Sequence, residues 1–243
     1  MLRLIAPLAL LAAAPALAAT PGEWTAPASP LYSFSYAIPP QAAAIPALRA
    51  RLLADRAAQL AKVRHDAAAE AAEAKRAGFP VRKFEYQQAW QVVTSLPGWL
   101  SLSASTYSYT GGAHGMTWSS AMLWDRKAAR ARNPLDLFTS KPALSEAIRT
   151  GFCAALNRQR AEKRGEPVKP GSTDEFDRCI DPVGQTVLLG SRGRRAFDRI
   201  GILVAPYEAG PYAEGSYEVT VPVTPAVLAA VRPQYRSSFA LGR

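Results

Sequence analysis

Histidine is the side chain that titrates near neutral pH, and the chain has only two of them, His65 and His114. His114 follows two glycines in the string Tyr109-Thr-Gly-Gly-Ala-His-Gly115, which is typical of a tight hairpin turn. At the mouth of this hairpin, His114 either polarises a ligand or bonds to the backbone and fixes the loop. The second interpretation is favoured, because no nucleophile or partner base is identifiable. His65 lies on the polar side of a predicted helix, where we expect it to be solvated.

The other residue types that perform chemistry lack a recognisable arrangement. No Ser or Cys lies in a G-x-S-x-G elbow, and the chain holds too few His and unpaired Cys for a zinc site. A carboxylate cluster beside Cys179 indicates a solvated turn in preference to a calcium site, since its spacing lacks the order of a calcium loop. The cluster consists of Asp174, Glu175, Asp177 and Asp181. Carboxylate pairs for glycoside hydrolysis exist at many positions, but sequence does not measure their separation. We therefore predict no catalytic residue, no metal site and no cofactor.

A second string, Ala205-Pro-Tyr-Glu-Ala-Gly-Pro-Tyr-Ala-Glu-Gly215, crowds glycines, prolines and tyrosines into one connector. Its tyrosines either build an aromatic shelf for a sugar or a protein partner, or pin the long connector onto the core. On the first interpretation, this connector and the hairpin mouth supply the candidate binding residues. They are Tyr109, His114, Tyr207 and Tyr212.

Residues 1–18 have the pattern of a secretory signal peptide. Arg3 supplies the positive n-region, an apolar core runs from Leu4 to Ala14, and Ala16-Leu17-Ala18 is a small-residue cleavage site. The apolar run is too short to span a bilayer, and no later segment is long and apolar enough to cross one. We expect an exported mature chain without a transmembrane segment, located in the periplasm or secreted.

The formal net charge is +10, and loss of Arg3 with the signal peptide lowers it to +9. A protein this basic favours anionic partners such as lipid head groups, lipopolysaccharide, acidic polymers or acidic proteins. Nucleic acid is a poor candidate, because export removes the encounter and no recognition motif is present. Arg194 and Arg195 are included among the candidate binding residues as a possible anion site, although a charge run is ordinarily a solvated face. The two basic runs are Arg192, Arg194, Arg195 and Arg199, and Arg158, Arg160, Lys163 and Arg164.

Cys153 and Cys179 are the only cysteines of the chain. In an oxidising compartment an isolated pair is most simply a disulfide, with free or metal-binding thiols as the alternatives. Closing a loop of this length stabilises a fold by about 3 kcal/mol in the chain-entropy model.

Hydrophobic periodicity predicts an α+β fold, in which an antiparallel sheet packs on one long helix and a second helix. After a leader over residues 19–30, helices are expected over 41–77, from a cap at Thr139 or Ser140, and over 225–231. A polar surface loop is expected over 157–175. Strands are predicted at 32–38, 83–94, 99–109, 114–124, 185–189, 199–205 and 216–222. We expect two closely packed subdomains, residues 31–135 and 136–243.

Five segments stand in a recognisable order along nearly the whole mature chain. They are Tyr32 to Ile38, Tyr109 to Gly115, Asp136-Leu137-Phe138, Ile200 to Tyr207 and Pro211 to Gly215. In this order and spacing they resemble the extracytoplasmic domain family shared by the anti-sigma factor RsiV and the N-terminal region of the peptidoglycan deacetylase PdaC.

The resemblance implies an α+β envelope domain that binds a glycan or a protein. The RsiV domain binds lysozyme, but the positive charge of this chain disfavours a cationic partner. The chemistry of PdaC belongs to a separate metal-dependent deacetylase domain, which we do not find in this sequence. We therefore predict a non-enzymatic periplasmic protein that binds peptidoglycan or an envelope protein. The alternatives are a glycan-modifying hydrolase or deacetylase-like enzyme with an unrecognised site, and an inhibitor of an envelope hydrolase.

Overall fold

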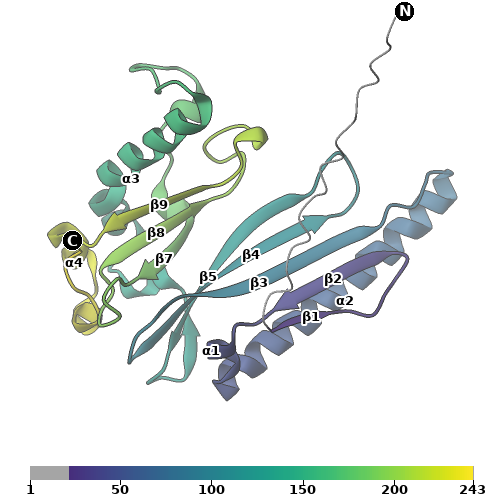
Figure 1. The fold of residues 1–243 in the computed structure, drawn as a ribbon, viewed down its shortest axis with the longest axis horizontal. Coiled ribbons are helices and arrows are strands. Elements are labelled where there is room, and N and C mark those ends of the chain that lie inside the picture. Colours follow the sequence, from purple (N-terminus) through teal and green to yellow (C-terminus); the bar gives the residue numbers. More distant parts are fainter. Residues whose placement is uncertain (1–21, 243) are drawn as a thin grey trace, which may run out of the picture.

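The computed structural model describes residues 22–242. The predicted signal peptide, residues 1–18, lies outside the described residues, as does the start of the leader. The described chain contains a six-stranded sheet, a three-stranded sheet and two main helices, so the predicted α+β class is confirmed (Figure 1). No helix within residues 22–242 is long and apolar enough to cross a membrane.

The larger sheet contains six strands in chain order. They are β1 (Glu23–Thr25), β2 (Tyr32–Ala37), β3 (Phe84–Ser95), β4 (Trp99–Tyr109), β5 (Met116–Asp125) and β6 (Arg130–Arg132). β2 and β3 run parallel, so the prediction of an antiparallel sheet is wrong for this pair. Parallel neighbours need a crossover connection, and helix α2 (Pro46–Ala77) supplies it. β1, which falls in the predicted leader, pairs antiparallel with β2.

A proline divides the helix that was predicted over residues 41–77. The short helix α1 (Pro40–Ala43) ends, Ile45 is extended at φ −102° and ψ 107°, and α2 begins at Pro46. Proline pushes the residue before it out of the helical region, but is well suited to the first helical position itself. α2 ends at Gly78, whose left-handed φ of 73° closes the last turn.

The glycine string joins β4 to β5 as predicted, in a loop that is wider than a two-residue turn. The antiparallel register ends at the pair Ser108↔Met116, so β5 begins two residues later than predicted. Gly111 and Gly112 have φ values of 100° and 93°, a region that side chains rarely adopt. The loop between the strands carries His114.

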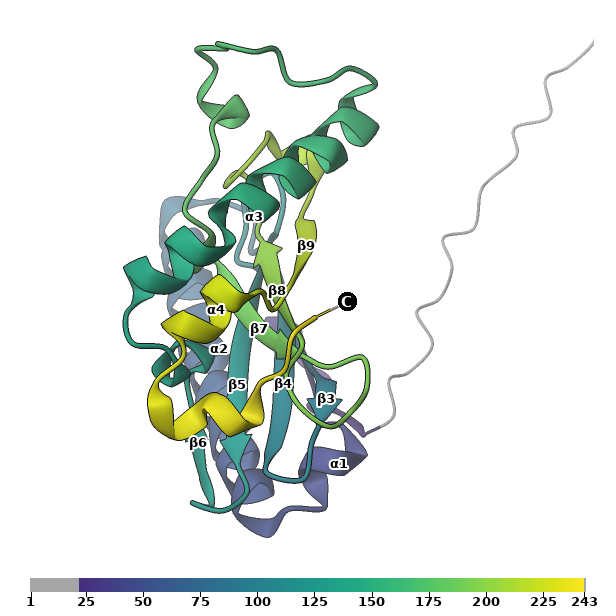
Figure 2. The same ribbon diagram turned by 90° about the vertical axis from the view of Figure 1, so that its left-hand side faces the viewer.

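The smaller sheet is antiparallel and contains β7 (Thr186–Gly190), β8 (Arg199–Val204) and β9 (Tyr217–Pro222). Helices α3 (Lys141–Arg164) and α4 (Pro225–Ala230) lie beside it (Figure 2). Short 3₁₀ helices punctuate the remaining chain at Pro134–Leu137, Glu175–Asp177, Pro182–Gly184, Tyr212–Glu214 and Pro233–Ser238. The predicted strands and the last helix are therefore present, with boundaries shifted by a residue or two.

α3 is longer than predicted at its C-terminal end. Its cap is Ser140, whose hydroxyl accepts a hydrogen bond from the backbone N–H of Ala143, as expected for an N-cap. The helix continues to Arg164 and ends at Gly165 in the left-handed conformation. The first residues of the predicted surface loop, 157–164, are therefore helical.

The elements form layers around two apolar cores. α2 packs on one face of the larger sheet, where Leu48 and Leu52 meet Trp90 and Leu102. On the other face, β7 contacts β3, β4 and β5. α3 covers the far face of the smaller sheet, and its Phe152 belongs to the second core. The larger sheet therefore has two covered faces, one toward α2 and one toward the smaller sheet (Figure 1).

Candidate functional site

Three of the predicted binding residues meet between two loops that are distant in sequence. The ring of His114 from the β4–β5 loop stacks on the ring of Tyr212, with centroids 4.0 Å apart. Tyr207 lies beside both, 6.4 Å from His114 and 5.5 Å from Tyr212 between centroids. We call these three residues the clasp, because they join the larger sheet to the connector between β8 and β9.

Hydrogen bonds orient the clasp rings. His114 Nδ1 lies 3.0 Å from its neighbour's carbonyl, Gly115 O, and the Tyr212 hydroxyl donates to the same oxygen at 3.0 Å. The Tyr207 hydroxyl lies 3.4 Å from His114 Nε2. Tyr109 is adjacent and donates to Gly112 O at 3.1 Å, within the hairpin loop. Nδ1 of His114 therefore faces a backbone carbonyl of its own loop, whereas Nε2 faces a tyrosine side chain of the connector.

Backbone geometry shows how tightly the clasp is built. Tyr207 has a φ of 71°, a left-handed conformation that costs a non-glycine residue of this kind about 1 kcal/mol or more. Gly115 has no room for a side chain, since a Cβ there would overlap the ring of Tyr107. The ring of Tyr207 is nevertheless 48% exposed, so one face of the clasp is open to solvent.

A fully buried arginine on α3 holds the connector that carries Tyr207 and Tyr212. Arg160 Nε donates to Ala209 O at 3.0 Å, and its terminal nitrogens donate to Asp177 O at 3.2 Å and Arg178 O at 3.0 Å. Arg160 therefore ties the connector and the segment around Cys179 to α3. The Cys153–Cys179 disulfide, with Cα atoms 5.4 Å apart, joins the same segment to the same helix.

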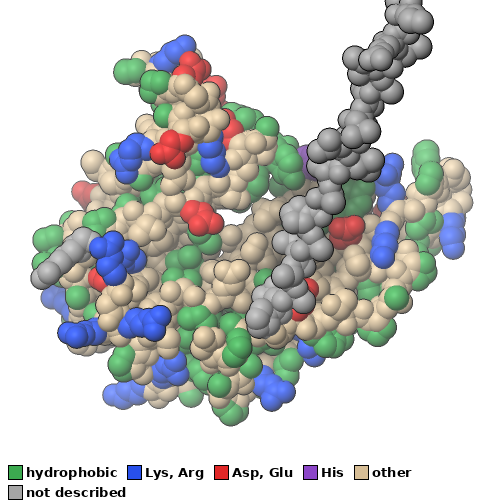
Figure 3. Space-filling model, viewed as in Figure 1, with side chains coloured by type: hydrophobic (Ala, Val, Ile, Leu, Met, Phe, Trp, Pro, Cys, Tyr) green, Lys and Arg blue, Asp and Glu red, His purple; other side chains and the backbone are tan. Residues whose placement is uncertain are grey.

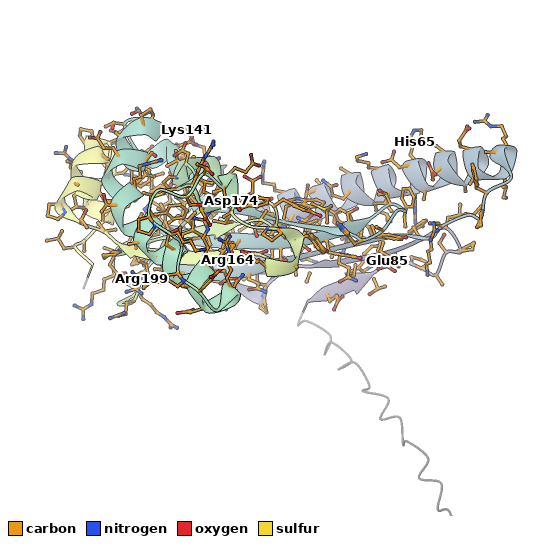
Figure 4. The ribbon with its side chains drawn as sticks, turned by 90° about the horizontal axis from the view of Figure 1, so that it is seen from above. His65, Glu85, Lys141, Arg164, Asp174 and Arg199 are labelled. Carbon is orange, nitrogen blue, oxygen red and sulfur yellow. A yellow bond between two sulfur atoms is a disulfide. The ribbon has the colours of Figure 1, made fainter. Side chains whose placement is uncertain are left out.

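Arg164, one turn further along α3, adds two ion pairs. Its guanidinium contacts Asp177 Oδ1 at 2.5 Å and Glu214 Oε1 at 2.8 Å, and Glu214 also accepts from the Tyr217 hydroxyl. Burial acts to raise the pKa of Glu214, but hydrogen bonds from Arg164 and Tyr217 hold it below the ordinary value. Figure 4 shows Arg164 at the end of α3, toward the middle of the molecule.

Three of the four basic residues in the run 158–164 are engaged within the protein, and Arg158 is exposed. Arg160 and Arg164 are engaged as described, and Lys163 Nζ donates to Glu214 O and Ser216 O at 2.6 Å each. Its amine also lies 3.9 Å from the centre of the Tyr217 ring. Arg160, Lys163 and Arg164 thus hold the connector against α3. These contacts were not predicted, because the run was assigned to a loop and not to a helix.

Below the clasp, the two sheets face each other across a cleft of about 380 Å³. Figure 3 shows the surface hollowed between the part built on the smaller sheet and the part built on the larger sheet. The cleft is lined mainly by polar side chains, including Ser103, Ser105, Thr117, Ser119, Ser216 and Glu218. The clasp thus lies beside a cleft rich in hydroxyl groups.

The remaining predicted residues lie elsewhere. Arg194 and Arg195 are exposed on the loop between β7 and β8, at the opposite end of β8 from Tyr207. Neighbouring arginines of this loop line a separate hollow of about 510 Å³. His65 is exposed on α2, as expected (Figure 4).

The carboxylates near Cys179 have separate structural roles. Asp174 caps the 3₁₀ helix Glu175–Asp177 through its bond from Phe176 N, Asp177 pairs with Arg164, and Asp181 accepts from Ser145. Within the described part of the chain, no three His, Cys, Asp or Glu residues approach closely enough to hold a metal ion. Asp174, Glu175 and Asp181 are exposed, as expected for a solvated turn, whereas Asp177 is mostly buried in its ion pair.

This arrangement defines an α+β protein of two facing sheets, with an aromatic contact between their connecting loops. Residues 27–117, which extend from the segment between β1 and β2 to the first residues of β5, match the family model described as Deacetylase PdaC. The resemblance to a PdaC-type domain is thereby confirmed for this segment. No curated protein matches the chain.

Two solved structures of the DUF3298 family are similar to the chain. One, from Pseudomonas aeruginosa PAO1, is 19% identical with a TM-score of 0.51, covering 91% of this chain and 94% of that one. Another, from Bacteroides fragilis NCTC 9343, is 16% identical with a TM-score of 0.46, covering 79% and 80%. The Pseudomonas protein shows that the fold extends beyond the PdaC-type segment over most of the chain.

Proposed function

We propose that the protein is an exported, non-enzymatic binding protein of the cell envelope, and that the clasp is part of a surface that contacts peptidoglycan. The observation that carries this proposal is the open face of Tyr207, held beside His114 and Tyr212 next to a hydroxyl-lined cleft. Aromatic faces with nearby polar groups suit sugars, which offer apolar ring faces and hydroxyl edges.

Three further features support an envelope location. The first residues have the composition of a signal peptide, Cys153 and Cys179 form a disulfide, and residues 27–117 match a PdaC-type domain. The positive net charge also favours the anionic polymers of the envelope.

Co-sedimentation with intact peptidoglycan sacculi tests the proposal. We expect the purified protein to pellet with sacculi, and Tyr207→Ala to weaken its apparent affinity about tenfold, the effect of losing one aromatic contact. Phe79→Ala is the matched control, because Phe79 is another exposed aromatic residue, at the end of α2 and outside the clasp. Wild-type protein that stays in the supernatant would contradict the proposal.

The same incubation distinguishes an enzyme from a binding protein. If soluble fragments or free acetate were released from the sacculi, and His114→Ala abolished that release, the glycan-modifying alternative would replace the binding function. We expect binding without turnover, because the two ring nitrogens of His114 already face Gly115 O of its own loop and the Tyr207 hydroxyl of the connector.

A second candidate function is binding of an acidic envelope protein or polymer through the β7–β8 loop. The hollow at this loop is lined by Arg192, Arg195 and Arg199, with Asp198 as its acidic residue. Figure 3 shows further blue side chains at this end of the molecule, near the C-terminus. Pull-down that survives Tyr207→Ala but is lost in Arg194→Ala/Arg195→Ala, and also at high salt, would assign binding to this loop.

A further inference from the structure

A second hollow lies on the opposite face of the larger sheet from the clasp, between α2 and the strands β3, β4 and β5. This groove has a volume of about 650 Å³. Its α2 wall carries Arg51, Asp55 and Gln59, and its outer edge is the β5 side chain Trp118, which is 40% exposed. None of these residues belongs to the clasp or to the arginine loop.

A row of side chains crosses four strands beneath α2, and three of its members, Gln88, Thr106 and Trp118, line the groove. The register pairs Tyr36 with Gln88, Gln88 with Thr106, and Thr106 with Trp118. Because side chains alternate along a strand, residues paired in this way project from the same face. The row runs from buried Tyr36 beneath α2 to Trp118 at the rim, so one end of the row is in the core and the other is exposed to solvent.

Asp55 on α2 lies over this row. One of its carboxylate oxygens, Oδ2, accepts hydrogen bonds from two side chains of the row. Asp55 Oδ2 accepts from the Tyr36 hydroxyl at 2.7 Å and from Gln88 Nε2 at 3.3 Å. The Trp90 ring N–H donates to Tyr36 at 2.8 Å, and the Tyr86 hydroxyl donates to Gln88 Oε1 at 2.5 Å. These bonds fix the carboxylate and the amide in place before any ligand arrives.

The other carboxylate oxygen is much less engaged. Among residues 22–242, Asp55 Oδ1 accepts one hydrogen bond, from Gln59 Nε2 at 3.5 Å, a distance at the limit of such a bond. Burial and the nearby Asp55 carboxylate raise the pKa of Tyr86 to about 12, so its hydroxyl keeps its proton at neutral pH. The groove therefore presents Asp55 Oδ1 as a carboxylate oxygen with one long hydrogen bond, and the side chains that hold this carboxylate keep their protons.

The charges along the groove indicate a neutral ligand. Its lining contains one acidic and one basic side chain, Asp55 and Arg51, in a protein that is otherwise strongly basic. The Asp55 carboxylate would repel a polyanion, and the Arg51 guanidinium would repel a cation. A fixed carboxylate, amide groups and an exposed indole face together fit a ligand with hydroxyl or amide donors on its edges and an apolar ring face.

We propose that this groove is a binding site for a neutral glycan strand, with Trp118 stacking on a sugar ring and Asp55 Oδ1 accepting from a hydroxyl or acetamido group. The groove presents a single carboxylate, whereas glycoside hydrolysis uses two that flank the bond. The site therefore binds the strand without cleaving it. The choice of a glycan rests on the proposed envelope function, but the groove itself is separate from the clasp.

Titration of the intact protein with chitotetraose, the tetramer of β-1,4-linked N-acetylglucosamine, tests this site by calorimetry and tryptophan fluorescence. We expect saturable binding that Trp118→Ala weakens about tenfold or more. Asp55→Asn, which keeps the shape of the side chain but removes its charge, should also weaken binding. Phe79→Ala and the clasp variant Tyr207→Ala should stay within about twofold of the wild type, since neither residue lines the groove.

Four outcomes would count against the groove. No saturable binding, equal binding by wild type and Trp118→Ala, or a loss confined to Tyr207→Ala would overturn the inference. So would binding of a soluble stem tetrapeptide from peptidoglycan in place of the sugar. If sacculi bind the protein but chitotetraose does not, the groove inference fails while the proposed function stands. If chitotetraose binds and sacculi do not, the proposed function fails while the groove inference stands.

Discussion

The groove and the clasp lie on opposite faces of the same sheet, near the same hairpin, and they are built in different ways. In the groove, the polar groups are held on α2 and the strands, with buried Tyr36 and Gln88 bonded to Asp55. In the clasp, rings from two connecting loops meet, and Tyr207 and His114 are largely exposed. The groove is therefore rigid without its ligand, while the clasp depends on contacts that keep two loops together.

The difference shows where each site is vulnerable. The groove depends on hydrogen bonds within its own walls. The clasp depends on α3, because Arg160 and Arg164 hold the connector that presents Tyr207 and Tyr212. A substitution on α3 should therefore affect the clasp and leave the groove intact.

Arg160→Ala should have the largest effect. It removes a fully buried guanidinium that donates to the buried carbonyl of Ala209 and to the less buried carbonyls of Asp177 and Arg178, which should lower the free energy of unfolding by about 2–4 kcal/mol. Urea unfolding measures the loss, and chitotetraose affinity of the folded fraction should be unchanged. Arg158→Ala, an exposed residue of the same helix, is the control and should change stability by less than about 0.5 kcal/mol. Equal effects of the two variants would show that Arg160 is not the anchor.

Tyr36→Phe addresses the groove in the same way. It removes the acceptor of the Trp90 N–H and a donor to Asp55, so we expect a loss of about 1–3 kcal/mol in unfolding free energy together with weaker chitotetraose binding. Sacculus binding through the clasp should not depend on this hydroxyl. Tyr32→Phe removes only a surface bond from Arg64 and serves as the control. An unchanged sugar affinity in Tyr36→Phe would argue against a pre-organised carboxylate.

Acidification should release the connector from α3. Despite the opposing effect of burial, hydrogen bonds from Arg164 and Tyr217 lower the pKa of Glu214 below its ordinary value of 4.5, and bonds from Ser172 and Arg164 lower that of Asp177. A carboxyl whose pKa is lower in the folded state stabilises the fold above its unfolded pKa, and this stability is lost as pH falls through the folded value. We expect the melting temperature to fall below about pH 4.5 and Arg164→Gln to reduce that dependence. An identical acid profile in the variant would contradict this role.

Tyr212→Phe should have the smallest effect. It keeps the stacking on His114 but removes one partly buried bond to Gly115 O, which should cost about 0.5–1.5 kcal/mol. Nuclear magnetic resonance of the His114 ring protons reports the loop directly. Their shifts should change in Tyr212→Phe and remain unchanged in Trp118→Ala, and a response to both variants would mean that clasp and groove are coupled.

The sequence was sufficient to predict most strands, both main helices and the disulfide, because these depend on local periodicity and on a cysteine pair. It also identified His114, Tyr207 and Tyr212, but not that they touch, since contact between loops about ninety residues apart is decided by the packing of the two sheets. The parallel pairing of β2 with β3 was missed for the same reason.

Polar residues on buried faces were the main source of error. Arg160 was taken for part of a basic surface loop, although it lies four residues after Leu156 on the apolar side of α3. Asp55 was passed over, although it falls on the helical stripe that contains Leu48 and Leu52. Similarly, Gln88 alternates with Tyr86 and Trp90 on the inward side of β3. A polar side chain that interrupts an apolar stripe is the signal that would have indicated both sites.

Hydrogen exchange of the protein, alone and with chitotetraose, tests most directly whether a prebuilt groove and a loop-held clasp coexist. The account predicts slow exchange in β3 to β5 in both states, faster exchange in residues 109–115 and 205–215, and protection by the sugar confined to residues near Asp55 and Trp118. Loops that exchange as slowly as the strands, or sugar protection that appears at the clasp instead, would contradict it.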